Sequence, residues 1–438
     1  MRTVEEYRAA VLAAVGGLGP GEPVEVALER ARGIVLGADI RSRTDVPPFD
    51  NSAMDGYAVR ADDILAATPF APVLLRVVAD IPAGSVLEPL VLPGTCARIM
   101  TGAPVPRSAD AIVPVEATDG GTQVVAVHQP ARRGAHVRRT GEDVRTYERV
   151  MKAGRVLGPA DIAAAAATGH GGVMAYPRPK VVVISTGSEL VPPGPTRPLP
   201  RGIIPDSNSY LLAAAVDEAG GDAVRLDVVT DDAERFGLAL DAAFADRSVV
   251  AVVTSGGVSV GAYDVVKTHF TERFGWGSEL VPDPAPGRPY GLFTTVAMQP
   301  GKPQGFGLVP RGGRERTLVP VFALPGNPVS VFVSFEVFVR PALQLLRGLP
   351  AVAGERRVVQ ARATASWHAA GARRQYIPVV AASGPSGWTV RPAGSRGSSS
   401  HLAATLATAN GLGIVEAGVG TVRAGTIVPV MLTREVPT

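Results

Sequence analysis

The segment VVAVVTSGGVSVGAYDVVKTHFTERF, residues 249–274, indicates most clearly which fold class this chain adopts. It begins with an apolar run typical of a buried strand, continues through a glycine-rich loop and ends in a helical stretch. The regions on either side repeat this alternation. Strands are predicted at 180–185, 223–229, 249–254, 293–298 and 318–324, and helices at 208–219, 232–245, 264–274 and 328–346. Such alternation requires right-handed crossovers, so we expect an α/β domain with a mostly parallel sheet covered on both faces.

The flanking sequence predicts further domains of a different kind. A capping box of Thr3 and Glu6 signals an opening helix, and a second helical stretch is predicted near 25–32. Pro159 suits the first turn of another helix, in a segment that we expect to pair with the N-terminal segment as a stalk. Short apolar runs between Pro and Gly residues predict two β domains. The predicted division is a stalk domain of residues 1–45 plus 149–178, an inserted β domain of 46–148, an α/β domain of 179–347 and a small C-terminal β domain of 348–438.

Composition narrows the class of protein. The 438 residues suffice for roughly three domains, and 46% hydrophobic against 19% charged residues excludes a disordered chain. The 43 basic and 40 acidic residues are scattered and give a net charge of +3, so we expect no nucleic acid and no membrane as partner. Charges at Glu5, Glu6 and Arg8 exclude a signal peptide, and no apolar run approaches the ~20 residues of a membrane span. We therefore expect a cytoplasmic location.

The metal-binding residues that zinc and iron–sulfur sites need are missing from the sequence. Cys96 is the only cysteine, and none of the six His residues has ligand spacing such as H-x-x-x-H. A metal site in this chain is therefore expected to hold a hard cation with carboxylate oxygen ligands.

Chemically active residues follow the predicted strands of the α/β domain. Ligands of an open parallel sheet bind at the carboxyl ends of its strands, because these ends meet at one edge. The loops at this edge are Thr186–Glu189, Pro205–Asn208, Thr230–Asp232, Ser255–Asp264, Gln299–Lys302 and Leu324–Pro328. Small residues let backbone N–H groups approach an oxyanion, carboxylates suit a metal ion, and Lys302 adds positive charge. Together the loops predict a phosphate-and-metal site.

Each of these residues also has a structural interpretation. Asp206, Asp231, Asp264 and Asn327 are placed to cap helices, Glu189 fits a solvated loop, Asp55 with Gly56 fits a β-turn, and Lys302 fits a surface charge. A further alternative is a serine hydrolase, because the G-x-S-x-G pattern around Ser259 resembles a nucleophile elbow. An elbow starts its helix at the serine, whereas here the helix is predicted to start only at Asp264. We therefore reject the hydrolase.

Seven motifs occur together in the order that one known family shows. They are PFDNSAMDGYA (48–58), IMTGAP (99–104), RRTGED (138–143), STGSE (185–189), SGGVSVG (255–261), LPGNPVS (324–330) and GSSSHL (397–402). Through them the chain closely resembles molybdopterin molybdenumtransferase, the MoeA / gephyrin E-domain family, over essentially its whole length. The run DNSAMDGY is highly specific to that family.

The resemblance implies an activity, partners and site residues. The family inserts molybdate into adenylated molybdopterin with release of AMP, uses Mg²⁺, forms homodimers and makes transient contact with other cofactor-biosynthesis proteins and apo-molybdoenzymes. By resemblance the catalytic residues are Asp55, Asp143, Asp264 and Lys302, and the metal ligands are Glu189, Asp231 and Asp264. Together with the loops above, the resemblance gives as substrate-binding residues Thr101, Thr186, Gly187, Glu189, Ser207, Asn208, Ser255, Gly256, Gly257, Ser259, Pro303, Pro325, Asn327, Ser398 and Ser400.

The sequence departs from the family pattern at two positions. Gln299 and Thr295 stand where members often carry lysine. Lys302, with Arg138 or Arg139 as a further candidate, must therefore supply more of the positive charge that holds an oxyanion.

Two other functions stay open at this point. One is a molybdopterin adenylyltransferase, because related proteins share the α/β domain, although the other three domains argue against it. The other is a non-catalytic scaffold, which the absence of a long linker in this sequence disfavours. If the chain is the insertase, Asp55 and Asp264 come from different predicted domains, so we expect a cleft shared between the two subunits of a homodimer.

Overall fold

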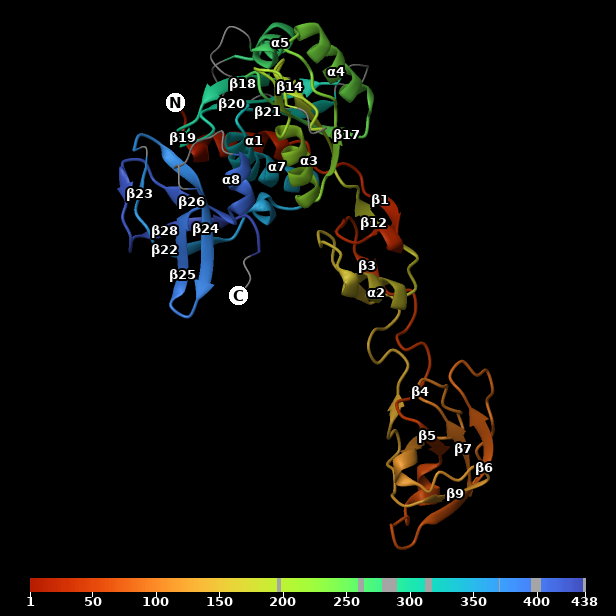
Figure 1. Ribbon diagram of the computed structural model, residues 1–438. Coiled ribbons are helices and arrows are strands. Elements are labelled where there is room, and N and C mark those ends of the chain that lie inside the picture. Colours follow the sequence, from red (N-terminus) through yellow and green to blue (C-terminus); the bar gives the residue numbers. More distant parts are fainter. Residues whose placement is uncertain are drawn as a thin grey trace. The chain divides into compact units, whose positions relative to one another are not determined.

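The computed structural model describes residues 1–194, 198–258, 264–277, 290–311, 317–369, 371–394 and 403–435. The chain divides into two compact units, which can be followed in Figure 1. Met1–Pro23 with Tyr176–Thr438 form the sheet unit, and Val24–Ala175 form the inserted unit. Each unit has hydrophobic cores of its own.

The sheet unit is built on a six-stranded sheet of order β16-β13-β17-β21-β20-β18. Its strands are β16 (Asp222–Arg225), β13 (Lys180–Ser185), β17 (Val249–Ser255), β21 (Leu318–Leu324), β20 (Pro303–Pro310) and β18 (Tyr290–Thr295). The first four strands are parallel, and β20 runs antiparallel to both of its neighbours. The predicted α/β fold with a mostly parallel sheet is confirmed.

Strand β20 was not predicted, and it explains where Lys302 lies. Because β20 runs opposite to β21, its first residue, Pro303, is placed at the carboxyl end of β21, two positions beyond the pair Gly305–Ala323. Lys302 immediately precedes Pro303. Lys302 therefore lies at the predicted edge of the sheet because β20 begins at that edge.

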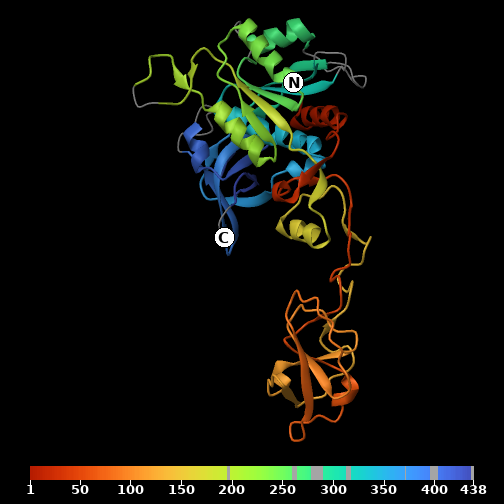
Figure 2. The same cartoon turned by 90° about the vertical axis from the view of Figure 1, so that its right-hand side faces the viewer.

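Helices cover both faces of this sheet, as Figures 1 and 2 show from two directions. One face carries α1 (Val4–Gly16), α3 (Asn208–Glu218), α6 (Pro328–Ser334) and α7 (Arg340–Leu346), and the other carries α4 (Ala233–Ala245) and α5 (Val265–Phe274). Alternate side chains of β13 serve the two faces: Val181 and Val183 pack with the first group, and Val182 and Ile184 with the second. This explains the continuous apolar run of the strand.

The opening helix α1 begins as predicted but packs elsewhere. The N–H of Glu6 donates to Oγ1 of Thr3 at 3.1 Å, and the N–H of Thr3 donates to Oε2 of Glu6 at 2.9 Å, so the capping box is confirmed. The buried face of α1 joins the core of the sheet unit, where the Tyr7 ring lies 4.8 Å from the Phe338 ring in an edge-to-face contact. The sequence analysis placed this helix in the stalk, because apolar periodicity shows that a face is buried but not against which element.

The segment Pro328–Leu346 is one continuous helix made of α6, a π-helical stretch η4 (Phe335–Val339) and α7. With a mean hydropathy of 1.5 it is the one helix among the described residues long and apolar enough to cross a membrane, but 89% of it is buried inside the protein. The sequence analysis counted no such run because Glu336 and Arg340 interrupt it. These two side chains form an ion pair of 2.8 Å in the interior, so the segment is a core helix.

The C-terminal part of the sheet unit is a second six-stranded sheet, of order β19-β24-β25-β22-β28-β26. Its strands are β19 (Met298–Gln299), β24 (Arg374–Gly384), β25 (Gly387–Pro392), β22 (Val358–Ala363), β28 (Ile427–Leu432) and β26 (Gly411–Val415). The expected small C-terminal β domain is confirmed. Strand β19 lies just before Lys302 and pairs with β24, so the Lys302 loop is fastened to this second sheet.

The inserted unit contains a five-stranded sheet of order β8-β5-β7-β6-β9. Its strands are β8 (Ala111–Pro114), β5 (Gly56–Val59), β7 (Thr95–Ile99), β6 (Val73–Ile81) and β9 (Val124–Val127). Smaller elements complete the unit: β1 (Val24–Ala27), η1 (Leu28–Arg30), β3 (Ile40–Arg41), β11 (Arg149–Met151), α2 (Pro159–Ala167) and β12 (Gly172–Tyr176). The two chain segments of the predicted stalk pair through β1 with β12 and β3 with β11. The division into four domains stays a prediction.

The helix predicted near residues 25–32 was wrong. Residues Val24–Ala27 form β1, and only the short 3₁₀ turn η1 follows. Val24 and Val26 alternate with Glu25, which is the two-residue period of a strand, and pairing with β12 decides in its favour.

His269 fills the gap between α4 and α5 in the sheet unit. Its ring makes edge-to-face contacts with Phe236, at 5.3 Å between centroids, and with Phe270, at 5.9 Å. Burial lowers the pKa of His269 below its ordinary value, because the apolar surroundings disfavour the imidazolium. Protonation of this histidine is therefore less favourable in the folded sheet unit than in the unfolded chain.

We predict that acidification destabilises the sheet unit through His269. Between the lowered pKa and the ordinary value of 6.5, the unfolded chain binds more protons than the folded chain, so stability falls as pH falls through this window. The urea concentration at the midpoint of unfolding should fall between about pH 7.5 and about pH 5, and it should fall less in His269→Gln than in the unchanged protein. The exposed His368 provides the control His368→Gln, which should keep the full pH dependence. If the urea midpoint of His269→Gln fell with pH as steeply as that of the unchanged protein, His269 would not be the source of the pH dependence.

Candidate active site

A cavity of about 780 Å³ lies at the carboxyl edge of the first sheet. The loops after β13, β17 and β21 line it, together with the beginnings of α3, α5 and α6 and the first residue of β20. The predicted site residues on its wall are Thr186, Gly187, Glu189, Ser207, Asn208, Asp231, Gly256, Gly257, Asp264, Pro303, Pro325 and Asn327. The fold thus brings together residues from five of the six predicted loops, and Pro303, which directly follows the sixth loop.

The glycines at this edge allow the strand ends to pack closely. Gly256 has a φ of +93°, and a Cβ there would lie 2.5 Å from the carbonyl oxygen of Thr186. The N–H of Gly256 donates to the carbonyl of Leu324 at 3.1 Å, and the N–H of Thr186 donates to the carbonyl of Ser255 at 3.0 Å. These N–H groups hold the loops to one another. The general expectation that small residues present N–H groups to an oxyanion therefore does not apply to the N–H groups of Gly256 and Thr186, and the role of both residues in substrate binding stays a prediction.

A helix N-terminus supplies positive character to the cavity instead. Asn327, Pro328 and Ser330 line the cavity at the start of the helix that runs to Leu346. The first N–H groups of a helix have no acceptor within the helix, and the helix dipole places partial positive charge there. An anion is favoured at this wall of the cavity.

The carboxylate of Asp231 fastens one loop to another. Its Oδ2 accepts a hydrogen bond from the N–H of Ser188 at 2.9 Å, and its own N–H donates to Oγ of Ser188 at 3.0 Å. The cap of α4 is the next residue, Asp232, which accepts from the N–H of Arg235 at 2.9 Å. The interpretation of Asp231 as a helix cap was therefore wrong.

Asp264 occupies the N-cap position of α5 and lines the cavity. Its side chain makes no capping hydrogen bond to the described first turn of α5. Asp264 therefore stands at the start of α5, where the cap interpretation placed it, and on the cavity wall at once.

The donor set of the cavity fits Mg²⁺ that arrives with a phosphorylated substrate. Among the described residues, the wall carries the three carboxylates Glu189, Asp231 and Asp264 and neither His nor Cys. Among the described residues, no three His, Cys, Asp or Glu side chains lie close enough to hold a metal by themselves. Mg²⁺ is commonly held by one or two carboxylates together with waters and substrate phosphates. Oxygen donors without a complete protein cage match that pattern.

Some predicted site residues lie outside the cavity wall. The side chain of Ser255 is only 1% exposed, and its Oγ lies 3.0 Å from Oγ of Ser185, so this hydroxyl is part of the structure beneath the wall. Lys302 is exposed next to the lining residue Pro303. Ser259, Ser398 and Ser400 lie outside the described residues.

Arg373 is a neighbour of the Lys302 loop that sequence reasoning missed. Its Nη1 donates to the carbonyl of Met298 at 3.3 Å, and its Nη2 donates to Oε1 of Gln299 at 3.1 Å. A cation thus contacts Gln299, one of the two positions where the family lysines are replaced. The sequence carries no signal for this contact, because the pairing of β19 with β24 joins segments about 75 residues apart.

In the inserted unit, Thr101 holds Asp55. The N–H of Thr101 donates to Oδ1 of Asp55 at 2.7 Å and its Oγ1 donates to the same oxygen at 2.8 Å. The backbone hydrogen bond, followed by that of the hydroxyl, lowers the pKa of Asp55. Asp143 is also in this unit, exposed, with its N–H donating to the carbonyl of Val46 at 3.0 Å.

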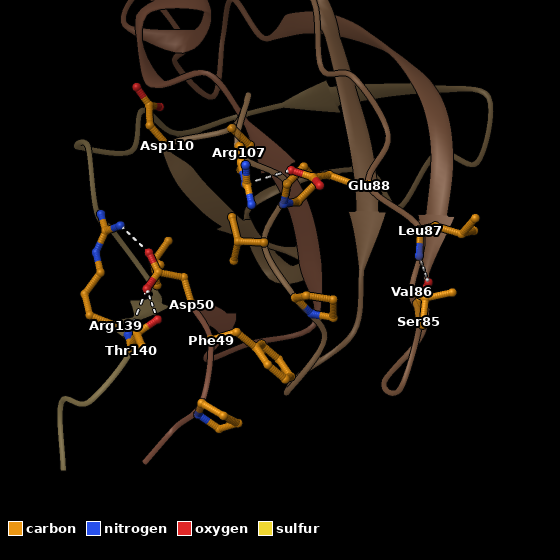
Figure 3. A pocket seen from close by; sticks show the side chains of 16 residues that line it. Phe49, Asp50, Ser85, Val86, Leu87, Glu88, Arg107, Asp110, Arg139 and Thr140 are labelled. Atoms are coloured by element: carbon orange, nitrogen blue, oxygen red, sulfur yellow. Dashed lines mark hydrogen bonds and ion pairs between the residues drawn. The ribbon is translucent and has the colours of Figure 1, made fainter. Parts of the chain in front are cut away.

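A second cavity, of about 740 Å³, lies wholly within the inserted unit, and Figure 3 shows its lining. Asp50 accepts hydrogen bonds from Thr140 and forms an ion pair of 2.7 Å with Arg139. Arg139 was a candidate helper of Lys302, but this ion pair neutralises its charge within the unit. The sequence analysis assigned no role to this cavity.

Family models match three consecutive segments of the chain. They are the MoeA N-terminal region (domain I and II) at residues 2–169, a probable molybdopterin binding domain at 182–345 and the MoeA C-terminal region (domain IV) at 360–433. The middle segment contains β13, β17, β21 and the loops of the cavity.

Named relatives and a solved structure agree with these matches. Molybdopterin molybdenumtransferase 2 of Mycobacterium tuberculosis (strain ATCC 25618 / H37Rv) is 47% identical over 351 residues, covering 80% of this chain and 81% of the relative. Molybdopterin molybdenumtransferase 1 of the same strain is 35% identical over 448 residues, covering 98% of each. The crystal structure of the molybdopterin biosynthesis MoeA protein from Pyrococcus horikosii is similar with a TM-score of 0.76 and 30% identity, covering 99% of both chains. The chain therefore belongs to the molybdopterin molybdenumtransferase (MoeA) family, whose role is molybdenum cofactor biosynthesis.

Proposed function

We propose that this chain inserts molybdate into adenylated molybdopterin, with release of AMP, in the cavity at the carboxyl edge of the sheet. The observation that supports the proposal most directly is the gathering of five of the predicted loops, with Pro303 beside them, around a cavity of about 780 Å³. This volume lies within the roughly 300–1,000 Å³ of small-molecule sites. Carboxylates and a helix N-terminus on one wall suit a substrate that carries both phosphate and a divalent cation.

The phosphates of the substrate would lie against the beginning of the helix at Asn327 and Ser330, where the positive end of the helix dipole favours an anion. The amide of Asn208 has a fixed orientation, because its Nδ2 donates to the carbonyl of Gly326 at 2.6 Å. Its Oδ1 has no hydrogen-bond partner among the described residues. That oxygen would accept a hydrogen bond from an N–H group of the substrate after a small adjustment of the wall.

Glu189, Asp231 and Asp264 would hold Mg²⁺ together with substrate oxygens. When bound, Mg²⁺ supplies positive charge that offsets the charge of the phosphoanhydride. Lys302 would attract molybdate to the same edge, and Arg373, on the adjoining loop, would add to the positive field. Pro303 and Pro325 shape the wall between them.

Asp55, Thr101 and Asp143 of the inserted unit belong to the same proposal. The hydrogen bonds from Thr101 keep Asp55 ionised, so Asp55 is suited to accept a hydrogen bond or bind a cation and not to donate a proton. We assign the chain to a cytoplasmic homodimer. In it, the product would pass to other cofactor-biosynthesis proteins or to apo-molybdoenzymes.

Turnover should depend on Mg²⁺. Dialysis against excess chelator should abolish release of AMP from adenylated molybdopterin in the presence of molybdate, and Mg²⁺ should restore it. Zn²⁺ should not, because the ionisable side chains that the described part of the cavity wall offers are carboxylates. Thermal denaturation in chelator should match that of the untreated protein, which separates loss of the metal from unfolding. Full turnover in chelator would contradict the metal assignment.

Asp264→Asn should lower kcat by roughly a hundredfold, since metal ligation is worth several kcal/mol. Asn caps a helix as well as Asp does, so α5 should keep its stability. The matched control is Asp241→Asn on α4, which removes only the surface pair with Arg273 at 2.7 Å. Turnover within a factor of about two of the control would assign Asp264 to a structural role.

Thr101→Val should raise the pKa of Asp55, because the hydroxyl hydrogen bond that favours the carboxylate is lost. The carboxyl carbon shift of Asp55, followed by NMR during an acid titration, reports this change directly. A carboxyl group with a lowered pKa stabilises the fold at pH values above that pKa, and this contribution is lost as the pH falls through the pKa. Thr101→Val has less of this stabilisation, so its acid unfolding should begin at a higher pH than that of the unchanged protein. Thr140→Val, which alters the same kind of contact to Asp50, should leave the Asp55 titration unchanged.

A further inference from the structure

Beneath the wall of the sheet cavity lies a buried carboxylate, Asp206, that the proposed reaction does not use. It is 2% exposed and accepts four hydrogen bonds. They come from the N–H groups of Asn208 (3.0 Å) and Ser209 (3.1 Å) and from the hydroxyls of Ser209 (2.5 Å) and Ser185 (3.1 Å). A buried carboxylate is stable only when its oxygens are satisfied in this way.

The hydrogen bonds around Asp206 have a fixed direction. A carboxylate can only accept, so the hydroxyl hydrogen of Ser185 points to Asp206. The oxygen of Ser185 then accepts from the hydroxyl of Ser255, which lies 3.0 Å away. On the other side, Ser209 donates to Asp206, so its oxygen accepts from Nε of Arg225 at 2.9 Å. We call this chain of Ser255, Ser185, Asp206, Ser209 and Arg225 the Asp206 network.

Members of the network are joined directly to residues of the cavity wall. Ser185 and Ser255 are the paired last residues of β13 and β17, and Thr186 and Gly256 follow them on the wall. Asp206 is followed by the lining residue Ser207 and then by Asn208, whose side chain reaches Gly326 on a third loop. One buried anion therefore fixes the starting points of three loops.

An ordinary helix cap does not need this arrangement. Asp232 caps α4 at the same edge with one hydrogen bond, at 2.9 Å, from an exposed position. The N-cap residue of α3 is Ser207, so the prediction that Asp206 is the N-cap was wrong by one position, although its carboxylate accepts from two N–H groups of the first turn. Two further bonds, from the hydroxyls of Ser185 and Ser209, extend its reach to β13 and to Arg225. Asp206 and the three serines are buried, so water competes little for the bonds among them, whereas Arg225 at the end of the chain is exposed.

We infer that Asp206 is a positioning residue of this site: its buried carboxylate orients the hydroxyls of Ser185, Ser255 and Ser209 and so holds the loops of the cavity in the geometry that binds the phosphate end of the substrate. The inference rests on the proposed function. Asp206 itself touches no substrate, and it acts through Thr186, Ser207 and Gly256, which line the cavity.

The test is Asp206→Asn. This variant keeps the shape of the side chain and one acceptor oxygen, but an NH₂ group replaces the other oxygen. The NH₂ group can only donate, and it would face hydroxyl groups that also donate, so the hydrogen bonds are lost. The control is Asp232→Asn, a cap of the same edge outside the network. Calorimetric binding of AMP in the presence of Mg²⁺ is measured at a temperature where circular dichroism shows all variants folded. We expect Asp206→Asn to weaken AMP binding about tenfold and to raise KM more than it lowers kcat, and Asp232→Asn to bind as the unchanged protein does.

Ser185→Ala supplies a second variant, because Ser185 is 0% exposed and does not line the cavity. It should weaken AMP binding in the same sense, and the double variant should lose no more than Asp206→Asn alone, since both changes break one chain of hydrogen bonds. If Asp206→Asn does not fold, Ser185→Ala against Asp232→Asn decides the question. AMP affinity within a factor of about two of the control, with changes confined to the denaturation midpoint, would overturn the inference. An unchanged protein that neither binds AMP nor inserts molybdate would instead refute the proposed function.

Discussion

The parallel register of β13, β17 and β21 is the constraint on which the rest of the sheet unit depends. Ser185 pairs with Ser255, and Ser255 pairs with Leu324, so the three strands end side by side in one row. Most chemical groups at the cavity follow one of these ends or approach the same row from β20, α3 or α5, and Asp231 comes from the loop before α4. The row also explains the small residues, because ends this close leave no room for a Cβ at Gly256.

The electrostatic balance at this edge is set by few cations. Three carboxylates line the cavity, while Lys302 stands on the loop that β19 fastens to the C-terminal sheet, and Arg373, just before β24, contacts that loop. Such a wall suits a divalent cation together with an anion better than an anion alone. Gln299 and Thr295 stand where family members often carry lysine. The side chain of Arg373 contacts Gln299, so a positive charge is still present beside one of these two positions.

In the inserted unit, one local device recurs. A threonine donates both its N–H and its hydroxyl to one carboxylate oxygen in three pairs: Thr101 to Asp55 (2.7 and 2.8 Å), Thr140 to Asp50 (2.8 and 2.9 Å) and Thr146 to Asp45 (2.7 and 2.9 Å). Each pair fastens together chain segments far apart in sequence and lowers the pKa of its carboxyl. The geometry of Asp55 is therefore a general feature of this unit, and its chemical role depends on what binds there.

The sequence by itself determined the α/β fold, the capping box of α1, the strands β13 and β21 and the loops that line the cavity, because apolar periodicity and turn residues act locally and parallel strands must end at one edge. It did not determine where α1 packs, that residues 24–27 form a strand, that Ser255 turns inward to Ser185, or that Arg373 reaches Gln299. Each of these depends on a partner distant in the sequence. A local pattern shows that a side chain needs a partner, and only the tertiary structure decides which partner it meets.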